Sequence, residues 1–281
     1  MILGIILGLY AITLFIPIIW GMLSSLKGKL EFRWNMFGLP KEWLFSNYSI
    51  VLQAFYVPVE SGAGFRNVYV LEMLLNSILY AVGGALIQTF IQYIMAYVSA
   101  RFRYKFGKVI YAIVIFALAF PTVGMTASSL YIAQGLHLTD SIIGMYIIKS
   151  YFLGMYFLVF YAQLKAMPDA YSEAAYIDGA GNFTVMMRII FPMIANTFFT
   201  IALLLFIQYW NDYTTPMLYM PNVPTLSYGL YYFDDLNRIA VIANTPMKLA
   251  ACIMMVIPVL ALFLVFHDRL MKNVSMGGIK E

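Results

Sequence analysis

The sequence contains little charge and almost no cysteine or histidine. Only 11% of its 281 residues are charged, whereas soluble domains average about 25%. The single cysteine, Cys252, excludes a disulfide framework and a cysteine metal site. His137 and His267 lie far apart, so no Cys/His ligand cluster is expected. The formal net charge of +4 is too small to indicate a nucleic-acid-binding protein.

Long apolar runs dominate what is present. Hydrophobic residues make up 63% of the chain, which indicates an integral membrane protein rather than a soluble enzyme. A helix of about 20 apolar residues crosses about 30 Å of hydrocarbon. Six runs reach that length, so we predict an all-α, multi-pass protein with six transmembrane helices, at residues 2–24, 76–99, 109–133, 142–164, 190–211 and 247–267.

A cluster of cations predicts the orientation of these spans. Arg101, Arg103, Lys105 and Lys108 fall within eight residues between the second and third spans. Short loops rich in Lys and Arg stay in the cytoplasm. Both termini and the loop around Glu173 are then expected to be cytoplasmic.

The first apolar run predicts a retained span. It has neither the basic start nor the small-residue end of a secretory signal. Trp34, Trp43, Tyr48 and Phe55 predict that the next segment lies at headgroup level. The expected organisation is a first helix at 1–24, an extracytoplasmic loop at 25–75, a five-helix core at 76–268 with loops 166–189 and 213–246, and a cytoplasmic tail at 269–281.

The most informative stretch runs from Glu173 to Pro192 and reads EAAYIDGAGNFTVMMRIIFP. Pro168 and Asp169 are suited to open a short helix before it. Gly179 can end that helix in a left-handed conformation, and Asn182 or Thr184 can cap a second helix. The pattern predicts a short helix at a membrane surface whose small, apolar face carries Ala170, Ala174 and Ile177.

The same stretch resembles the EAA loop of ABC importer permeases. The matching positions are Glu173, Ala174, Ala175, Gly179, Ile189, Phe191 and Pro192. Phe191 departs from the pattern, where Leu is more usual. Asp178, Gly179 and Ala180 are similar to the sugar-importer branch, close to the smaller permease of maltose-type systems. An amphipathic surface helix with no docking role is the alternative.

The resemblance implies a type I ABC importer permease in the plasma membrane of a prokaryote, and no enzyme activity in this chain. It implies a heterodimer with a second permease, two copies of an ABC ATPase that bind ATP and Mg, and an extracytoplasmic sugar-binding protein. Neither a phosphate-binding loop nor a Ser-His-Asp pattern occurs here. The implied ATPase-coupling residues are Ala170, Glu173, Ala174, Ala175, Asp178, Gly179 and Ala180.

Polar residues at membrane depth are candidates for a substrate pathway, because they are expensive there. The stretch QYWNDY, residues 208–213, ends the fifth span and combines aromatic, amide and carboxylate groups. It has the chemistry of a sugar site and resembles a feature of sugar permeases. Interfacial capping is the alternative, and Lys149 and Asp212 are possible partners. The candidates are Gln88, Gln92, Lys149, Gln208, Trp210, Asn211 and Asp212.

Three further matches follow from the resemblance. Asn47 and Tyr48 resemble a short feature before the second span of sugar permeases, and Gly278 to Lys280 resemble their tail. The outer loop is expected, by position only, to contact the binding protein or else to cap the bundle. Its candidate residues are Pro221, Asn222, Pro224 and Tyr228.

Two other functions compete with sugar import. One is a permease of the same fold for amino acids, phosphate or metals, and the other is a membrane enzyme or assembly factor. Asp178-Gly179-Ala180 and the QYWNDY stretch disfavour the first, and the second would need a catalytic cluster that the sequence does not show. The sequence does not specify which sugar is carried.

Overall fold

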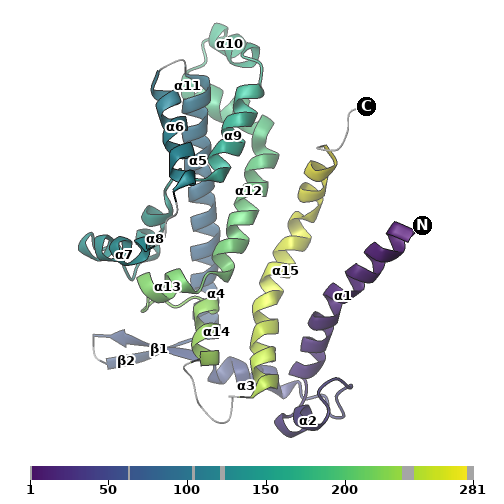
Figure 1. The fold of residues 1–281 in the computed structure, drawn as a ribbon. Coiled ribbons are helices and arrows are strands. Elements are labelled where there is room, and N and C mark those ends of the chain that lie inside the picture. Colours follow the sequence, from purple (N-terminus) through teal and green to yellow (C-terminus); the bar gives the residue numbers. More distant parts are fainter. Residues whose placement is uncertain (1, 63, 103–104, 121–123, 236–243, 277–281) are drawn as a thin grey trace. The chain divides into compact units, whose positions relative to one another are not determined.

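The structure is a computed structural model that describes residues 2–62, 64–102, 105–120, 124–235 and 244–276. Within these ranges it is helical except for one β-hairpin (Figure 1). The chain forms two compact units. Unit 1 comprises Met1–Ser77, Tyr213–Met217 and Pro221–Leu264, and unit 2 comprises Ile78–Asp212, Leu218–Met220 and Val265–Glu281.

Unit 1 begins with three helices and a hairpin. Asn47 joins the start of α3 to the chain after α1, because its amide donates to the carbonyls of Ser25 at 2.7 Å and Lys27 at 3.0 Å. The hydroxyls of Tyr48 and Ser25 lie 2.7 Å apart. Asn47 and Tyr48, which resemble the short feature of sugar permeases, therefore connect α3 to the end of α1 by hydrogen bonds. The elements are α1 (Ile2–Ser25), α2 (Lys29–Trp34), α3 (Ser46–Ala54), β1 (Tyr56–Ser61) and β2 (Gly64–Tyr69).

The hairpin is antiparallel and packs on a helix that is distant in sequence. Tyr56 pairs with Tyr69, and alternate residues of β1 are buried, as expected for a strand with one covered face. Phe55, just before β1, meets Phe233 of α14 with ring centroids 5.1 Å apart. The remaining elements that contribute to unit 1 are α4 (Val70–Ile78), α13 (Thr214–Tyr219), α14 (Leu226–Asp235) and α15 (Thr245–Met276).

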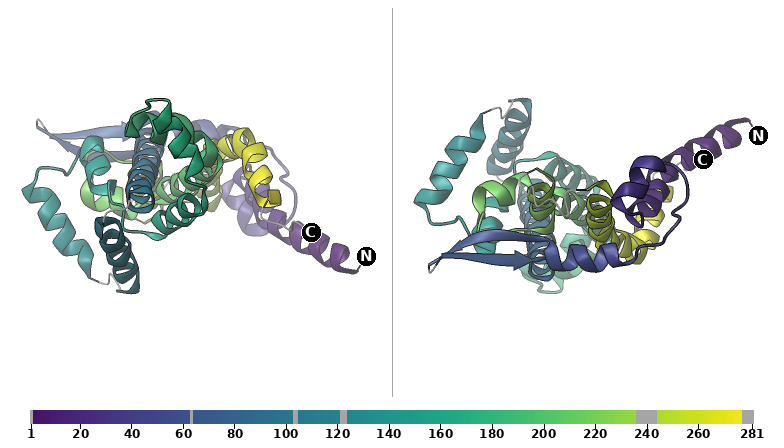
Figure 2. Two further views of the ribbon diagram at one scale, coloured as in Figure 1. Left: turned by 90° about the horizontal axis from the view of Figure 1, so that it is seen from above. Right: turned by 90° about the horizontal axis from the view of Figure 1, so that it is seen from below.

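The core of unit 2 is a bundle in which α5 packs against α9 and α12 (Figure 2). Tyr93 lies at its centre, fully buried, with its ring 5.9 Å from Phe160 and 5.6 Å from Phe191. Its hydroxyl donates to the carbonyl of Met186 at 2.7 Å, which satisfies the buried polar atom. The bundle elements are η1 (Leu79–Gly83), α5 (Gly84–Arg101), α9 (Met155–Ala166), α11 (Asn182–Thr184), η2 (Val185–Ile190) and α12 (Phe191–Asn211).

Two predicted spans are interrupted in the structure. The run at 109–133 divides into two helices separated by a left-handed Gly124 with φ of 83°. The run at 142–164 divides where α8 ends and residues 150–154 leave the helix. Hydrophobicity predicts burial in lipid but does not detect such breaks. The elements are α6 (Lys105–Ala119), α7 (Met125–Gly135), α8 (Ile142–Lys149) and α10 (Ala170–Ile177).

Three helices in the described part of the chain are long and apolar enough to cross a membrane. They cover Ile6–Ser25, Val70–Arg101 and Asn182–Asn211. The second is longer than the predicted run at 76–99, because α4, η1 and α5 are continuous. Six transmembrane helices therefore stay a prediction.

Candidate functional site

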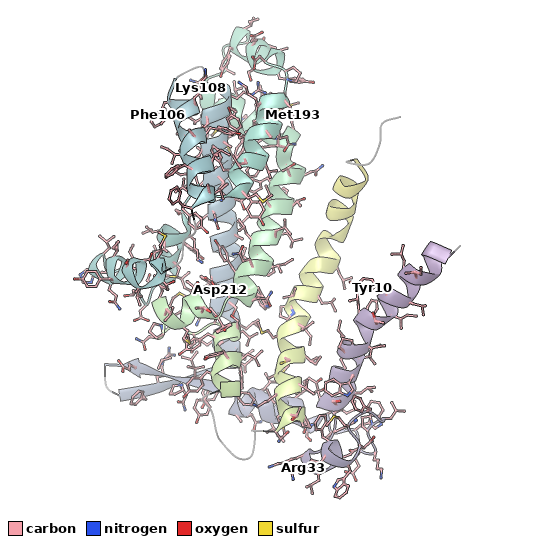
Figure 3. The ribbon with its side chains drawn as sticks, viewed as in Figure 1. Tyr10, Arg33, Phe106, Lys108, Met193 and Asp212 are labelled. Carbon is pink, nitrogen blue, oxygen red and sulfur yellow. The ribbon has the colours of Figure 1, made fainter. Side chains whose placement is uncertain are left out.

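A buried polar cluster lies in unit 2 around Asp212, the residue that follows α12 (Figure 3). The Tyr80 hydroxyl donates to Asp212 Oδ2 at 2.9 Å, and Lys149 Nζ lies 3.7 Å from the same oxygen. The side chains of Lys149 and Asp212 are only 14% and 18% exposed. The structure thus pairs two charges that the sequence presents 63 positions apart.

Two tyrosines and two glutamines extend this cluster. Lys149 Nζ lies 4.6 Å from the centroid of the Tyr209 ring, which suits a cation–π contact. The Tyr209 hydroxyl donates to Gln88 Oε1. Gln92, one turn further along α5, is buried, and its Oε1 has no hydrogen-bond partner among the described residues. The cluster presents aromatic faces, amides and a neutral ion pair together.

The other candidates of the QYWNDY stretch differ in burial. Trp210 is 2% exposed and packs against Phe206 with ring centroids 5.6 Å apart. Gln208 and Asn211 are exposed, and the Asn211 amide donates to the carbonyl of Ile207 at 2.8 Å. Trp210 is therefore a core residue in this conformation. Its role in a substrate pathway stays a prediction, as does that of its neighbours.

Sequence reasoning missed the two tyrosines of the cluster. Tyr209 lies inside the QYWNDY stretch, between the candidates Gln208 and Trp210. Tyr80 precedes Gln88 by eight residues, a spacing that keeps both on one helical face. Periodicity of polar and aromatic residues along 80–92 is the signal that could have found it.

The short helix α10 has the predicted end at Gly179. The φ angle of Gly179 is +82°, in the left-handed region that favours glycine. Gly179 N–H donates to Tyr176 O at 3.0 Å, and Ala180 N–H donates to Ala175 O at 2.9 Å. These two bonds are the Schellman arrangement, which satisfies carbonyls at a helix end. The helix and its corner are confirmed as local structure.

The predicted cap of the following helix is wrong. Gly181 occupies the position before α11, with extended backbone, and no side-chain oxygen caps the helix. Asn182 and Thr184 instead lie within α11. The two capping side chains were placed one to three residues too late, because boundaries are the least reliable part of a sequence prediction.

One face of α10 is open in the isolated chain. Glu173, Ala174 and Ile177 are exposed, and Ile177 is 86% exposed. Ser172 and Ala175 are buried, so they hold the helix against the rest of unit 2. Of the other predicted coupling residues, the exposed ones are Ala170, Asp178 and Gly179, and Ala180 is half-buried.

A pocket of about 590 Å³ lies beside α10. Arg101, at the end of α5, contacts Asp169 at 2.6 Å between Nη1 and Oδ1. The Arg101 side chain is 8% exposed, and its Nε and Nη2 lack hydrogen-bond partners among the described residues, as does Ser172 Oγ. Arg101 thus ties α5 to the residue that precedes α10. The lining residues are Arg101, Phe102, Asp169, Ser172, Glu173, Tyr176 and Asn182.

The candidate residues of the loop after α13 lie in unit 1. Pro221 is exposed, and Asn222 Oδ1 accepts the Glu60 N–H at 2.9 Å. Pro224 is buried, and its carbonyl accepts from the Asn76 amide at 3.1 Å. Tyr228 is also buried, which raises the pKa of its hydroxyl. Pro221 and Asn222 are therefore the more accessible pair.

Two further predictions concern metal ligands and the tail. Within the described residues, no three His, Cys, Asp or Glu side chains are grouped so as to hold a metal ion. The predicted tail match at Gly278, Ile279 and Lys280 lies outside the described residues.

Comparison with known proteins assigns the family. Residues 92–276, more than half of the chain, match the model of the binding-protein-dependent transport system inner membrane component. The chain belongs to this family. It is thus a permease, a membrane component of a transport system rather than a catalytic subunit.

Two relatives of the permease cover almost all of it. It is 25% identical over 279 residues to the diacetylchitobiose uptake system permease protein NgcG of Streptomyces coelicolor, covering 97% of this chain and 86% of the relative. It is 27% identical over 284 residues to the probable starch degradation products transport system permease protein AmyC of Thermoanaerobacterium thermosulfurigenes, covering 99% and 95%.

A solved structure shares the fold of the permease. That structure is a bacterial ABC transporter described as involved in the import of the acidic polysaccharide alginate. The TM-score is 0.78, the sequence identity is 22%, and the match covers 95% of this chain and 94% of the other. The ABC importer permease fold implied by the EAA-like stretch is confirmed.

Proposed function

We propose that the permease is a subunit of an ATP-driven importer that takes up a sugar or oligosaccharide from a binding protein. The support is the agreement between the Asp178-Gly179-Ala180 sequence and the relatives, which are named for a chitobiose derivative and for starch degradation products. A second permease would complete the translocation pathway as a heterodimer. Two ATPase subunits in the cytoplasm would bind ATP and Mg.

The observation that carries this proposal is the exposed face of α10, ended by the left-handed Gly179. Glu173 on this face can accept charge-assisted hydrogen bonds from a partner surface. Ile177 offers an apolar contact beside it. ATP-driven closure of the ATPases would push on this face, and the Arg101–Asp169 pair would pass the displacement to α5.

The buried cluster around Asp212 is the proposed part of the sugar pathway in this subunit. Sugars offer hydroxyls that need donors and acceptors, together with apolar ring faces that stack on aromatic groups. Gln88, Gln92 and the Lys149–Asp212 pair supply the first kind of contact, and Tyr80 and Tyr209 supply the second. The Lys149–Asp212 ion pair adds no net charge to the cluster, and a cluster without net charge suits an uncharged sugar.

The test is the change Gly179→Asp in the reconstituted importer. A residue with a side chain costs about 1 kcal/mol or more in the left-handed region, and the carboxylate would stand on the docking face. We expect the permease pair to assemble but uptake to be lost. The ATPases should dissociate, or hydrolyse ATP without responding to the loaded binding protein.

Gly181→Asp is the matched control. Gly181 is exposed and two residues away, but its φ is −76°, so a side chain there introduces no backbone strain. We expect it to retain most of the stimulated ATP hydrolysis. Normal stimulation and uptake in Gly179→Asp would show that the loop only connects two helices, and would remove the main support for coupling.

The substrate class needs a separate measurement. Titration of the cognate binding protein with sugars, amino acids and phosphate distinguishes a sugar importer from a permease of the same fold for another solute. Binding of an amino acid or phosphate, with no sugar bound, would reject the sugar proposal and leave the importer proposal intact.

A further inference from the structure

The segment between α1 and α3 exposes large apolar side chains although it lies outside every predicted span. We name residues 28–45 the Trp34 loop. Trp34 is 89% exposed and Phe37 is 82% exposed. Apolar groups concentrated in this way indicate a contact surface rather than ordinary solvent exposure. The exposed members are Leu30, Trp34, Met36, Phe37, Leu39, Trp43 and Phe45.

The Trp34 loop is held in shape by a buried lysine. Lys27 is 1% exposed, and its Nζ donates to the carbonyls of Asn35 at 2.7 Å and Met36 at 3.2 Å. The Asn35 side chain closes the next turn, donating to Leu39 O at 2.8 Å and accepting from Gly38 N–H at 2.9 Å. The exposed side chains are thus presented by an ordered backbone.

The loop also turns back along α1, a helix long and apolar enough to cross a membrane. Trp20 Nε1 donates to the carbonyl of Met36 at 3.0 Å, and the rings of Trp20 and Phe37 lie 6.2 Å apart. Trp20 precedes the last residue of α1, Ser25, by five positions. At 1.5 Å per residue, Trp20 lies about 7.5 Å before the end of α1, and the contact therefore brings Phe37 back beside the last turns of the span.

The side chains of the loop match the boundary between headgroups and acyl chains. Aromatic residues concentrate at that level of a membrane. Lys29, Arg33 and Lys41, in the same segment, are exposed and are suited to lipid phosphates; Arg33 is labelled in Figure 3. We propose that the Trp34 loop is a lipid anchor, which inserts Trp34 and Phe37 into the interface of the leaflet where α1 ends.

The experiment uses the assembled importer in nanodiscs of phosphatidylethanolamine and phosphatidylglycerol. A nitroxide is attached to a cysteine at Trp34 or Phe37 in a Cys252→Ser background, and its collisions with oxygen and with a nickel chelate are measured. Oxygen partitions into lipid and the chelate into water. Both sites are exposed, so a label fits at each, and the label at Phe37 takes the place of the ring that lies beside Trp20. Ser61, exposed at the hairpin end, is the aqueous control.

We expect oxygen collisions to exceed nickel collisions several-fold at Trp34 and Phe37, and the order to reverse at Ser61. Preferential nickel access at Trp34 and Phe37 would place the loop in water and overturn the proposal. Low access to both reagents would place it against a protein, either the second permease or the binding protein, and would overturn it equally.

The variant Lys27→Met tests independently whether Lys27 holds the Trp34 loop in place, with the label at Phe37 as the readout. Loss of the ammonium group removes the two bonds from Lys27 to the carbonyls of Asn35 and Met36 and leaves the bond from Trp20 to Met36 in place. The label at Phe37 should then become more mobile and more accessible to nickel. An unchanged profile would contradict the claim that Lys27 fixes the depth of the loop.

Discussion

Lys149 Nζ and Asp212 Oδ2 lie 3.7 Å apart and join the end of α8 to the residue that follows α12. Neither charge is well hydrated, and Asp212 also accepts the Tyr80 hydroxyl. A charge is costly at membrane depth unless it is paired. The pair therefore holds two segments of unit 2 together while remaining neutral.

Removing one charge of this pair should destabilise the protein more than removing both. Lys149→Met leaves a buried carboxylate without its cation, which destabilises a protein by about 3 kcal/mol. The double variant with Asp212→Asn should recover most of that loss. Unfolding midpoints and the yield of assembled importer measure the effect. A loss in the double variant equal to the sum of the losses in Lys149→Met and in Asp212→Asn alone would show that the charges do not interact.

The hairpin supplies a control for that cycle. Arg66 and Glu72 also form an ion pair, at 2.8 Å, but their side chains are 53% and 40% exposed. Exposed pairs add little to stability because water and salt screen them. Arg66→Ala should leave the unfolding midpoint unchanged.

Arg101 and Asp169 should matter for coupling more than for folding. Arg101→Lys keeps the charge but loses the planar fork, and Asp169→Asn loses the carboxylate. Coupling free energies between sites are typically large enough to change a response about fivefold or more. We expect the ratio of uptake to ATP hydrolysis to fall by such a factor in either variant, with the complex still assembled.

Arg188→Ala is the matched control for these variants, because Arg188 is exposed on η2 nearby in sequence. It should leave the ratio unchanged. If Arg101→Lys and Asp169→Asn also retain the normal ratio, α5 does not receive motion from α10 through this contact.

Trp210 and Asn211 are adjacent in sequence, but replacing them should affect different properties, stability for Trp210 and uptake for Asn211. Trp210→Ala empties a buried site and should destabilise unit 2 by about 3 to 5 kcal/mol. Asn211 is exposed, so Asn211→Ala should leave assembly intact. Lower uptake by an assembled Asn211→Ala importer would support a pathway role, and normal uptake would favour the capping role.

The orientation predicted from the basic cluster can be measured with an impermeant thiol reagent. In a Cys252→Ser background, a cysteine at Gly181 should be unreactive in intact cells, whereas one at Pro221 should react. Both positions are exposed, so burial does not explain a difference between them. Labelling of Gly181 from outside would reverse the topology and exclude contact between α10 and a cytoplasmic ATPase.

Local features of this protein followed from the sequence alone. The left-handed corner was predictable because Gly179 follows a short helix and glycine alone adopts that backbone without strain. Membrane class and family followed from apolar run length and from the Glu173–Pro192 stretch, since both depend on residue type and spacing. The predicted spans ran through the breaks at Gly124 and at residues 150–154 because hydrophobicity was their only criterion, although Pro121 and Gly124 are helix-breaking residues in the sequence.

Contacts between distant segments were decided only by the tertiary structure. Lys149 and Asp212 were only possible partners in the sequence, and packing of the helices places them 3.7 Å apart, with the Tyr80 hydroxyl on the same carboxylate. Arg101 marked orientation in the sequence, whereas folding gives it Asp169 as a partner. Trp210 was a candidate for the substrate pathway, yet it is buried, because hydrophobicity does not specify which side of a helix meets its neighbours. Local backbone preference acts between residues close in the chain, whereas these partnerships depend on long-range packing.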